Sequence, residues 1–370
     1  MAALESSDGS PISVSDDVQT MTLTVLNVAY PLAPAGPDAV GGAEQVLACL
    51  DAALVQAGHR SIVVACEGSV SAGTLVPTPV PRGELTDDVR RWVQAEHRRR
   101  IEEALASWPV DVIHLHGLDF DQYLPPPGAP ALVTLHLPPG WYAPAALRPA
   151  RPETYLVCVS AAQRRACPPD APLLPEIENG VPVGALTARH AKRGFAIALG
   201  RICPEKGFHL ALDAAKRASV PMLLAGEVFR YPWHEAYFRQ EILPRLDRQR
   251  RFIGPIGFAR KRRLLTAARC LLVPSLAPET SSLVAMEALA CGTPVVAFPA
   301  GALPEIVEHG KTGFLVHDEQ EMAGAIAAAA DLDPDVCRET ARCRFSVERM
   351  VNQYLEVYQW LARRGRRQAA

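Results

Sequence analysis

The stretch FAIALGRICPEKGFHLALDAAKRASVPMLLAGE, residues 195–227, holds two short apolar runs on either side of a longer segment with helical periodicity. We expect strands at 195–201 and 221–227, with a helix at 207–218 between them. A strand, a helix and a second strand in this order are typical of a parallel sheet with helical crossovers. This stretch therefore predicts an α/β fold.

The same alternation of apolar runs and helical patterns recurs on both sides of this stretch. Apolar strand-like runs lie at 23–30, 61–66, 111–117, 131–136, 154–160 and 294–298, and a helical pattern covers 41–59. The proline-containing stretch 163–193 is interpreted as a linker. We therefore predict a disordered tail at 1–20, a Rossmann-like domain at 21–185, a second at 190–345, and a terminal helix with a basic tail at 346–370.

Composition narrows the class of protein. A net charge of −2 offers no bulk attraction for nucleic acid. The nine cysteines include no Cys-x-x-Cys pair, which favours buried free thiols in a reducing cytoplasm over disulfides or a zinc site. No apolar run is long enough to span a membrane, and the first 20 residues do not resemble a signal peptide. Basic clusters at 98–100, 261–263 and 363–367 permit weak peripheral membrane contact or are simply solvated.

Two doubly wound domains place a ligand at the carboxyl ends of their strands, so the loops there should carry the chemistry. In GRICPEKG, residues 200–207, Arg201 ends a strand and Lys206 precedes a helix. A forked cation and a point charge beside helix amides suit a diphosphate. The alternative is a solvated loop with two incidental cations.

A second constellation is APETSSLVAMEALACGTPVV, residues 277–296. Ser281 or Ser282 should cap a helix there, and Gly292 should end it. Glu279 lies ahead of the helix, near its positive end, whereas Glu287 lies inside an apolar helix and needs a partner or a ligand hydroxyl. The alternative is that Glu279 supports the cap and Glu287 is a surface acid.

The first domain contributes histidines. His136 ends the strand at 131–136, and we expect His114 and His116 to project to opposite faces, one toward the core and one toward the cleft. We place His116 and Trp141 on the acceptor side of the cleft. Their spacing indicates no metal site, and each histidine has a purely structural alternative. The aspartates of DFD, residues 119–121, are interpreted as ordinary loop residues rather than a metal motif.

Gly41 and Gly42 precede a helix, where backbone can approach a phosphate, but they do not form a dinucleotide fingerprint. Together, GGAE (41–44), VTLH (133–136), ENGVP (178–182), GRICPEKG, ETSSLVAMEALACGTPVV (279–296) and GALPEIVEHGKTGFLV (301–316) resemble the retaining glycosyltransferases of family 4. The resemblance covers residues 23–360. It implies the GT-B fold, two doubly wound Rossmann-like domains facing a cleft, with a C-terminal helix crossing back to the first domain.

The resemblance also implies roles. Arg201 and Lys206 match cations on the donor diphosphate, Glu287 an acid on the ribose, and Glu279 an acid on hydroxyls of the transferred sugar. His136 matches a histidine beside the reacting carbon.

Further positions match parts of the family's donor site. Gly41 and Gly42 match the loop that closes on the donor, and the loop 253–256, ending at Ile256, matches backbone that contacts the base. The resemblance also implies that the helix start at Ser282, Leu283 and Val284 faces the diphosphate. The family usually has Phe-Gly where this chain has Ser281-Ser282, so the sugar pocket differs.

The resemblance implies a retaining hexosyltransferase that uses a nucleotide-diphosphate sugar. The cations Arg201 and Lys206 favour a diphosphate site that needs no metal, and we expect no other cofactor. A non-catalytic sugar-nucleotide-binding protein should lack one of His136, Arg201, Lys206 or Glu279, and all four are present. A pyridoxal-phosphate enzyme would need a lysine in a matching context. The acceptor stays open among a lipid-linked saccharide, a lipopolysaccharide, a small metabolite and a protein.

Overall fold

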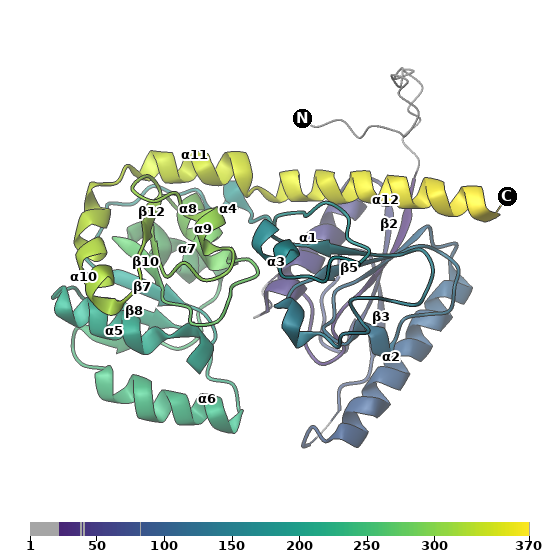
Figure 1. Ribbon diagram of the computed structural model, residues 1–370, viewed down its shortest axis with the longest axis horizontal. Coiled ribbons are helices and arrows are strands. Elements are labelled where there is room, and N and C mark those ends of the chain that lie inside the picture. The colour runs from purple at the N-terminus through teal and green to yellow at the C-terminus, as the bar shows by residue number, and fades with distance from the viewer. Residues whose placement is uncertain (1–21, 38, 40, 82, 370) are drawn as a thin grey trace, which may run out of the picture.

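The computed structural model describes residues 22–37, 39, 41–81 and 83–369, so the expected disordered tail at 1–20 lies outside the described residues. The described chain forms two parallel six-stranded sheets, each covered by helices, that lie next to each other (Figure 1). This confirms the expected α/β fold with two Rossmann-like halves.

The first sheet is built from apolar, β-branched segments, which are almost wholly buried except in the edge strand at 74–78. Its order is β3-β2-β1-β4-β5-β6, and every pair is parallel. The strands are β1 (Thr24–Val28), β2 (Arg60–Cys66), β3 (Thr74–Thr78), β4 (Val112–Leu115), β5 (Ala131–Leu135) and β6 (Thr154–Cys158). The helices α1 (Gly42–Gln56), α2 (Asp87–Ser107) and α3 (Ala161–Arg165) belong to this half. Burial on both faces explains why the strands are nearly continuous apolar runs.

The second sheet has the order β12-β11-β10-β7-β8-β9 and is also parallel. Its strands are β7 (Ala196–Leu199), β8 (Met222–Ala225), β9 (Arg250–Phe252), β10 (Cys270–Val273), β11 (Val295–Ala297) and β12 (Gly313–Leu315). The helices are α4 (Val183–Leu186), α5 (Phe208–Arg217), α6 (Pro232–Tyr237), α7 (Phe258–Ala267), α8 (Leu283–Ala290), α9 (Leu303–Ile306), α10 (Glu319–Ala328) and α11 (Pro334–Arg344).

In both sheets the chain adds strands first on one side of the first strand and then on the other, so the strand order reverses between β1 and β4 and between β7 and β10. Ligands of open α/β sheets bind outside the carboxyl ends of the strands at such a switch point. The segments that leave these four strands carry Gly41, His116, Arg201 and Glu279. The topology therefore gathers the sequence-predicted residues at the two switch points.

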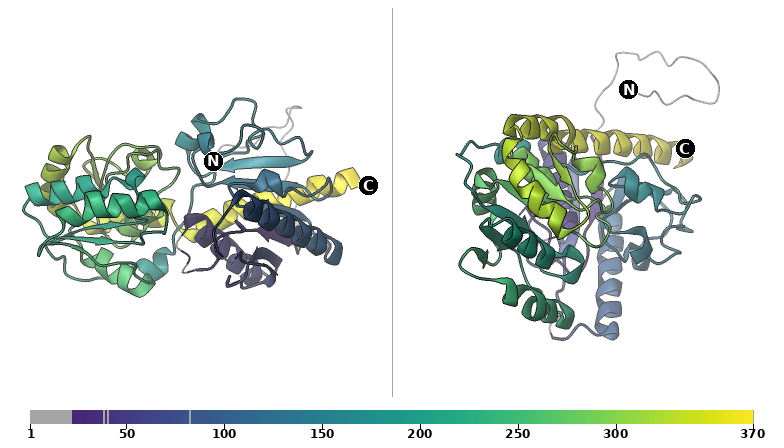
Figure 2. Two further views of the ribbon diagram at one scale, coloured as in Figure 1. Left: turned by 90° about the horizontal axis from the view of Figure 1, so that it is seen from below. Right: turned by 60° about the vertical axis from the view of Figure 1, so that its left-hand side comes forward.

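The terminal helix α12 (Val347–Ala369) runs along the first domain, as Figures 1 and 2 show from several sides. Met350, Tyr354 and Tyr358 lie one turn apart and pack with Leu23 and Leu50 of the first domain. Their spacing of four puts them on one helix face, which is why the burial of this polar-looking segment is one-sided. The expected crossing back is confirmed.

The cysteines and the longest helices bear on the expected thiols and on the membrane-span question. All nine cysteines are free, with Sγ of Cys158 and Cys167 3.6 Å apart. No helix in the described part of the chain combines the length and the apolar composition that a membrane span requires.

Candidate active site

The loop after β7 is shaped by two glycines in left-handed regions. Gly200 has φ +149° and Gly207 has φ +62°, and a Cβ on Gly207 would lie 2.2 Å from the carbonyl oxygen of Pro274. Only glycine allows the loop to approach the next strand end so closely. The loop presents Arg201 as an exposed side chain and places Lys206 at the start of α5.

Lys206 and Glu279 form an ion pair where this loop approaches Pro274. Lys206 Nζ lies 2.6 Å from Glu279 Oε1, and the same oxygen accepts a hydrogen bond from Ser275. The Glu279 side chain is only 11% exposed. Its backbone is also held, because its carbonyl accepts a bond of 2.7 Å from the N–H of Ala302. Cation and acid are therefore positioned as one pre-organised pair.

Helix α8 carries Glu287 in an apolar setting. Glu287 is 5% exposed and forms an ion pair with Lys261 of α7. Burial raises the pKa of Glu287, and Lys261 acts in the opposite direction. The acid is thus not a free surface group, and its partner is a lysine that sequence reasoning had assigned to a basic cluster.

The expected serine cap of α8 is wrong. Ser282 occupies the cap position with φ −127° and ψ 86°, yet its side chain makes no capping hydrogen bond, and Ser281 Oγ is buried with no partner among the described residues. This ψ departs from the more extended backbone that usually aims a cap oxygen at the helix. The first N–H groups of a helix have no intrahelical partner, so the first N–H donors of α8 are not satisfied by a side-chain cap. Gly292, with φ +72°, follows the helix as expected.

The beginnings of α1 and α8 meet. A Cβ on Gly42 would lie 3.1 Å from Leu283 Cδ1, so the first turn of one helix touches the first turn of the other. A Cβ on Gly41 would lie 1.9 Å from the carboxylate of Glu44, which folds back over the same helix start. Two helix N-termini thus converge. The carboxylate of Glu44 covers the start of α1, whereas the start of α8 has no side-chain cap and carries a partial positive charge that favours an anion.

His136 links this region to the first sheet. The ring atom Nε2 of His136 lies 3.0 Å from Nδ1 of His116. The backbone N–H of His136 donates a hydrogen bond of 2.9 Å to the hydroxyl of Tyr142. Its carbonyl accepts a 2.8 Å bond from Thr280 Oγ1, the neighbour of Glu279. Burial lowers the pKa of His136 to about 3, so the ring is neutral at physiological pH.

The expectation that His114 and His116 project to opposite faces is wrong. Side chains two residues apart in a strand share a face, and the two ring centroids are 4.0 Å apart. The division of roles comes instead from their neighbours. His114 bonds Tyr358 of α12 at 2.6 Å and Thr134 at 2.7 Å, whereas His116 reaches His136.

The remaining expected site residues lie around this group. Trp141 is 50% exposed in a short turn after His136, and Ile256 packs against the apolar core of the second domain. Among the described residues, no hydrogen bond or ion pair joins Trp141, Ile256 or Glu287 to the Lys206–Glu279–His136 group. Asp119 of DFD accepts bonds from Gln94 at 2.7 Å and from Tyr123 at 3.1 Å.

Sequence reasoning missed two features of this region. Thr280 joins the two halves through His136, and Glu305 does the same through the N–H of Ala161 at 3.1 Å. Cys203, Glu205 and His234 form a close cluster of metal-binding side chains. The first two stand in the GRICPEKG motif, but nothing in the sequence points to His234.

Comparison with known proteins agrees with this geometry. A family model described as Glycosyltransferase Family 4 matches residues 40–167, and one described as Glycosyl transferases group 1 matches residues 194–331. A glycogen synthase of Mycobacterium tuberculosis is 26% identical, covering 90% of this chain and 91% of that protein. A phosphatidyl-myo-inositol mannosyltransferase of Mycobacterium leprae is 30% identical over 51% of this chain and 54% of its own length.

Solved structures agree as well. AviGT4, a glycosyltransferase involved in avilamycin A biosynthesis, has a TM-score of 0.69 and 26% identity, covering 92% of this chain and 98% of its own. Anabaena HepE, solved in complex with UDP-glucose, has a TM-score of 0.70 and 21% identity, covering 91% and 99%. The two halves match the two domain models of one enzyme class, and the chain is therefore a glycosyltransferase of the GT-B fold, with a family 4 domain followed by a group 1 domain.

Proposed function

We propose that this glycosyltransferase moves a hexosyl group from a nucleotide-diphosphate sugar to an acceptor hydroxyl, with retention of the anomeric configuration. The observation that carries the proposal is the convergence of the α1 and α8 N-termini beside Lys206 and Glu279. Helix amides and a lysine suit a diphosphate, and the adjacent carboxylate suits sugar hydroxyls. The fold shared with HepE, which was solved with UDP-glucose, supports a nucleotide sugar as donor.

The acids of the site do not form a glycosidase pair. Glu279 and Glu287 are each held by a lysine, and Glu287 lies on the buried helix α8. We therefore infer front-face substitution without a covalent enzyme intermediate. The bond from the anomeric carbon to the diphosphate breaks as the acceptor oxygen bonds to that carbon on the same face. The acceptor proton passes to the departing diphosphate oxygen.

The cations stabilise the charge that develops on the leaving group. Lys206 and Arg201 lie on the loop that ends at α5, where they can face the diphosphate, and the helix amides add fixed dipoles. Glu279 then shares Lys206 with the phosphate and turns its free oxygen toward the sugar. In the proposed mechanism, the neutral ring of His136 lies beside the reacting carbon and adds no positive charge there.

A panel of nucleotide sugars in a thermal-shift assay should identify the donor, because a ligand that binds the folded state raises its stability. Proton NMR of the product with that donor should then show the donor's own anomeric configuration. An inverted product would exclude the proposed course. A donor that binds but is never transferred to any acceptor would favour a non-catalytic binding protein.

We propose that the diphosphate is neutralised by protein groups and not by a bridging metal. After dialysis against EDTA, added Mg²⁺ should leave the turnover number unchanged. A turnover number that depends on Mg²⁺ would show that a metal bridges the phosphates.

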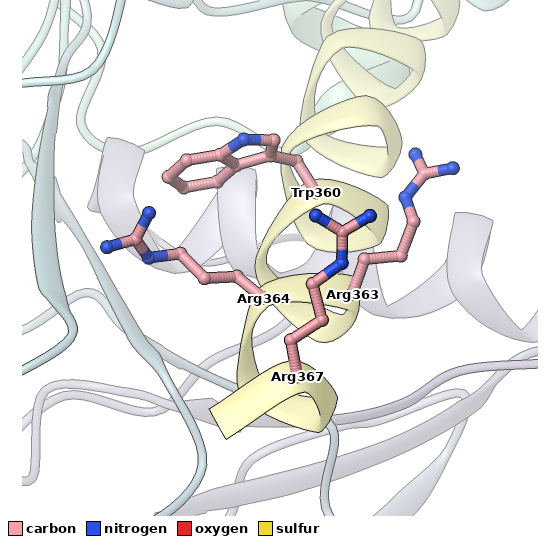
Figure 3. Close-up of a pocket in the computed structure, with 4 residues that line it drawn as sticks. All are labelled: Trp360, Arg363, Arg364 and Arg367. Carbon is pink, nitrogen blue, oxygen red and sulfur yellow. The ribbon is translucent and has the colours of Figure 1, made fainter. Parts of the chain in front are cut away.

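We also propose a cytoplasmic location with weak peripheral membrane contact through the end of α12. Trp360, Arg363, Arg364 and Arg367 line a shallow hollow there (Figure 3). Trp360 is 40% exposed, and the Arg364 guanidinium lies 5.7 Å from its ring centre. An indole beside arginines suits an anionic lipid surface.

Co-sedimentation with vesicles that contain phosphatidylserine should retain the parent chain and lose the double variant Arg363→Ala, Arg367→Ala. Equal binding to phosphatidylcholine alone would contradict this contact.

A further inference from the structure

The motif Cys203-Pro204-Glu205 places a thiol and a carboxylate on one tight turn. Pro204 opens the 3₁₀ helix η3 (Pro204–Lys206), so the two flanking side chains leave the same short segment. His234 belongs to α6, which also begins with a proline, Pro232. The fold brings these two turns together, although they lie in different elements of the second domain.

The three side chains are close enough to share one ion. Cys203 Sγ, a carboxylate oxygen of Glu205 and a ring nitrogen of His234 all lie within 4.8 Å of one another. In a tetrahedral zinc site, bond lengths of about 2.0–2.3 Å place neighbouring ligand atoms about 3.3–3.8 Å apart. Small side-chain rotations would therefore bring the three groups into that geometry.

Two atoms of the cluster lack any other partner. His234 is 4% exposed and Cys203 is fully buried. His234 Nδ1 and Glu205 Oε2 are buried and have no hydrogen-bond partner among the described residues. Buried polar atoms without partners are uncommon because they lose their hydration without replacement. An ion at the centre of the cluster would satisfy both.

We propose that Cys203, Glu205 and His234 bind one borderline-soft divalent transition metal ion of the zinc type. Thiolate, imidazole and carboxylate are the ligands that Zn²⁺ prefers, whereas Mg²⁺ and Ca²⁺ require an oxygen shell. The thiolate and the carboxylate neutralise the two charges of the ion. The three protein ligands leave a fourth position for water.

The ion would tie α6 to the loop that carries Arg201 and Lys206. Glu205 is already an anchor of that loop, because its carbonyl accepts a 2.8 Å bond from the N–H of Leu276. The metal site is therefore a positioning site within the loop that carries Arg201 and Lys206. The proposal does not depend on the identity of the donor or on retention.

The competing explanation is that His234 is a packing residue. Its ring lies edge-on to Tyr231 at 5.2 Å and to Trp233 at 5.7 Å, and Cys203 Sγ makes a weak bond of 3.5 Å to the carbonyl of Arg201. Packing alone requires no ion, so metal titration separates the two explanations.

The test is a Co²⁺ titration of the full chain, freed of metal with EDTA and kept reduced with a phosphine. We expect one equivalent of Co²⁺ to bind with a thiolate-to-cobalt charge-transfer band and the intense visible bands of tetrahedral cobalt, and Zn²⁺ to displace it. Cys203→Ser should abolish the thiolate band. His234→Gln should weaken Co²⁺ binding at least tenfold.

Matched controls are the exposed Cys343→Ser and His317→Gln, which should leave the titration unchanged. Cys167→Ser tests the other close thiol pair, formed with Cys158, and should also retain the band. The proposal is overturned if the parent chain gives no thiolate band, or if the band survives Cys203→Ser or disappears in Cys167→Ser. Should Cys203→Ser fail to fold by circular dichroism, the parent and Cys167→Ser titrations decide alone.

Discussion

At Lys206, one ammonium group is paired with Glu279, an acid that precedes the start of helix α8. Its 2.6 Å contact with Glu279 holds it in place before any ligand arrives, because the glycine at 207 lets the loop approach the next strand end. A cation that is already oriented loses little conformational entropy when it binds a phosphate.

Removal of either cation of the loop should weaken binding of the nucleoside diphosphate. Each charge-assisted contact is worth about 1.5–3 kcal/mol, which corresponds to about 10- to 150-fold in affinity. We expect Arg201→Ala and Lys206→Ala to show this loss in calorimetry while the fold is kept. The control is Lys216→Ala, an exposed lysine of α5. Affinity like that of the parent in both loop variants would remove these residues from the donor site.

His136 should matter more for turnover than for donor affinity. Its ring is neutral, lies against His116, and is connected through its carbonyl to Thr280 beside Glu279. In His136→Ala, the turnover number should fall more steeply than the donor affinity. The opposite pattern, normal turnover in a protein with a lowered melting temperature, would make His136 a structural residue.

Helix α8 carries Glu287 and follows directly after the segment that carries Glu279. Its residues from Ala285 to Ala290 are buried, and its start packs against Gly42 through Leu283. The serines in front of it make no capping bond, which leaves its first amides without a side-chain partner.

Substitution at the start of α8 should separate donor binding from folding. Ser282→Gly should keep most activity, because the smaller residue leaves the approach to the amides open. Ser282→Val should fold but bind the donor poorly, since a branched apolar side chain crowds the phosphate. Ser281→Phe should change the preferred donor or acceptor more than the melting temperature. Donor affinity of Ser282→Val equal to that of the parent would show that this helix start is not the phosphate site.

Helix α2 should make stability depend on pH. His97 is fully buried with a 3.0 Å contact between its Nε2 and the carbonyl of Ala29, and burial lowers its pKa to about 4. The unfolded chain protonates this ring below about pH 6.5, so its contribution is complete above that pH and decreases as the pH falls toward 4. Between pH 7.5 and 5.5 the loss is about 1.3 kcal/mol.

Urea unfolding at pH 7.5 and 5.5 measures this contribution. His97→Gln should lose about 1.3 kcal/mol less than the parent over that interval, whatever its stability at pH 7.5. An identical loss in both proteins would mean that His97 is not held neutral in the fold.

At the scale of the whole molecule, α12 stabilises the domain that is most distant from it in the chain. Tyr354 and Tyr358 are fully buried and reach Thr134 at 2.9 Å and His114 at 2.6 Å in the first sheet. Arg364 and Arg366 add ion pairs to Glu153 and Asp111. The contacts of α12 therefore contribute to the stability of the first domain.

Loss of one hydroxyl should reveal this dependence. Tyr358→Phe leaves a buried nitrogen of His114 unpaired, which costs about 1–3 kcal/mol. Hydrogen exchange should quicken in β4 and β5 and stay unchanged in β7 and β8. The exposed Arg363→Ala serves as the control on the same helix. Faster exchange in β7 would contradict the separation of the two domains.

The strands, the helices and the order of the loop residues could be predicted from local sequence patterns. Buried strands appear as apolar runs because both faces of a parallel sheet are covered, and the loops after them carry Arg201, Lys206 and Glu279 in recognisable order. The helix of 346–370 was also evident, since Met350, Tyr354 and Tyr358 recur with a spacing of four. Local periodicity and turn chemistry suffice for such features, because neighbours in the chain decide them.

The contacts between functional side chains could not be predicted in this way. Lys206 contacts Glu279, Glu287 contacts Lys261, and the start of α1 touches that of α8 because the strand order and the domain packing bring them together. His234 joins Cys203 and Glu205 for the same reason. Periodicity shows which face of an element is buried, but the partner on that face is chosen by packing among segments far apart in the chain. The partners of each functional side chain therefore follow from the fold as a whole.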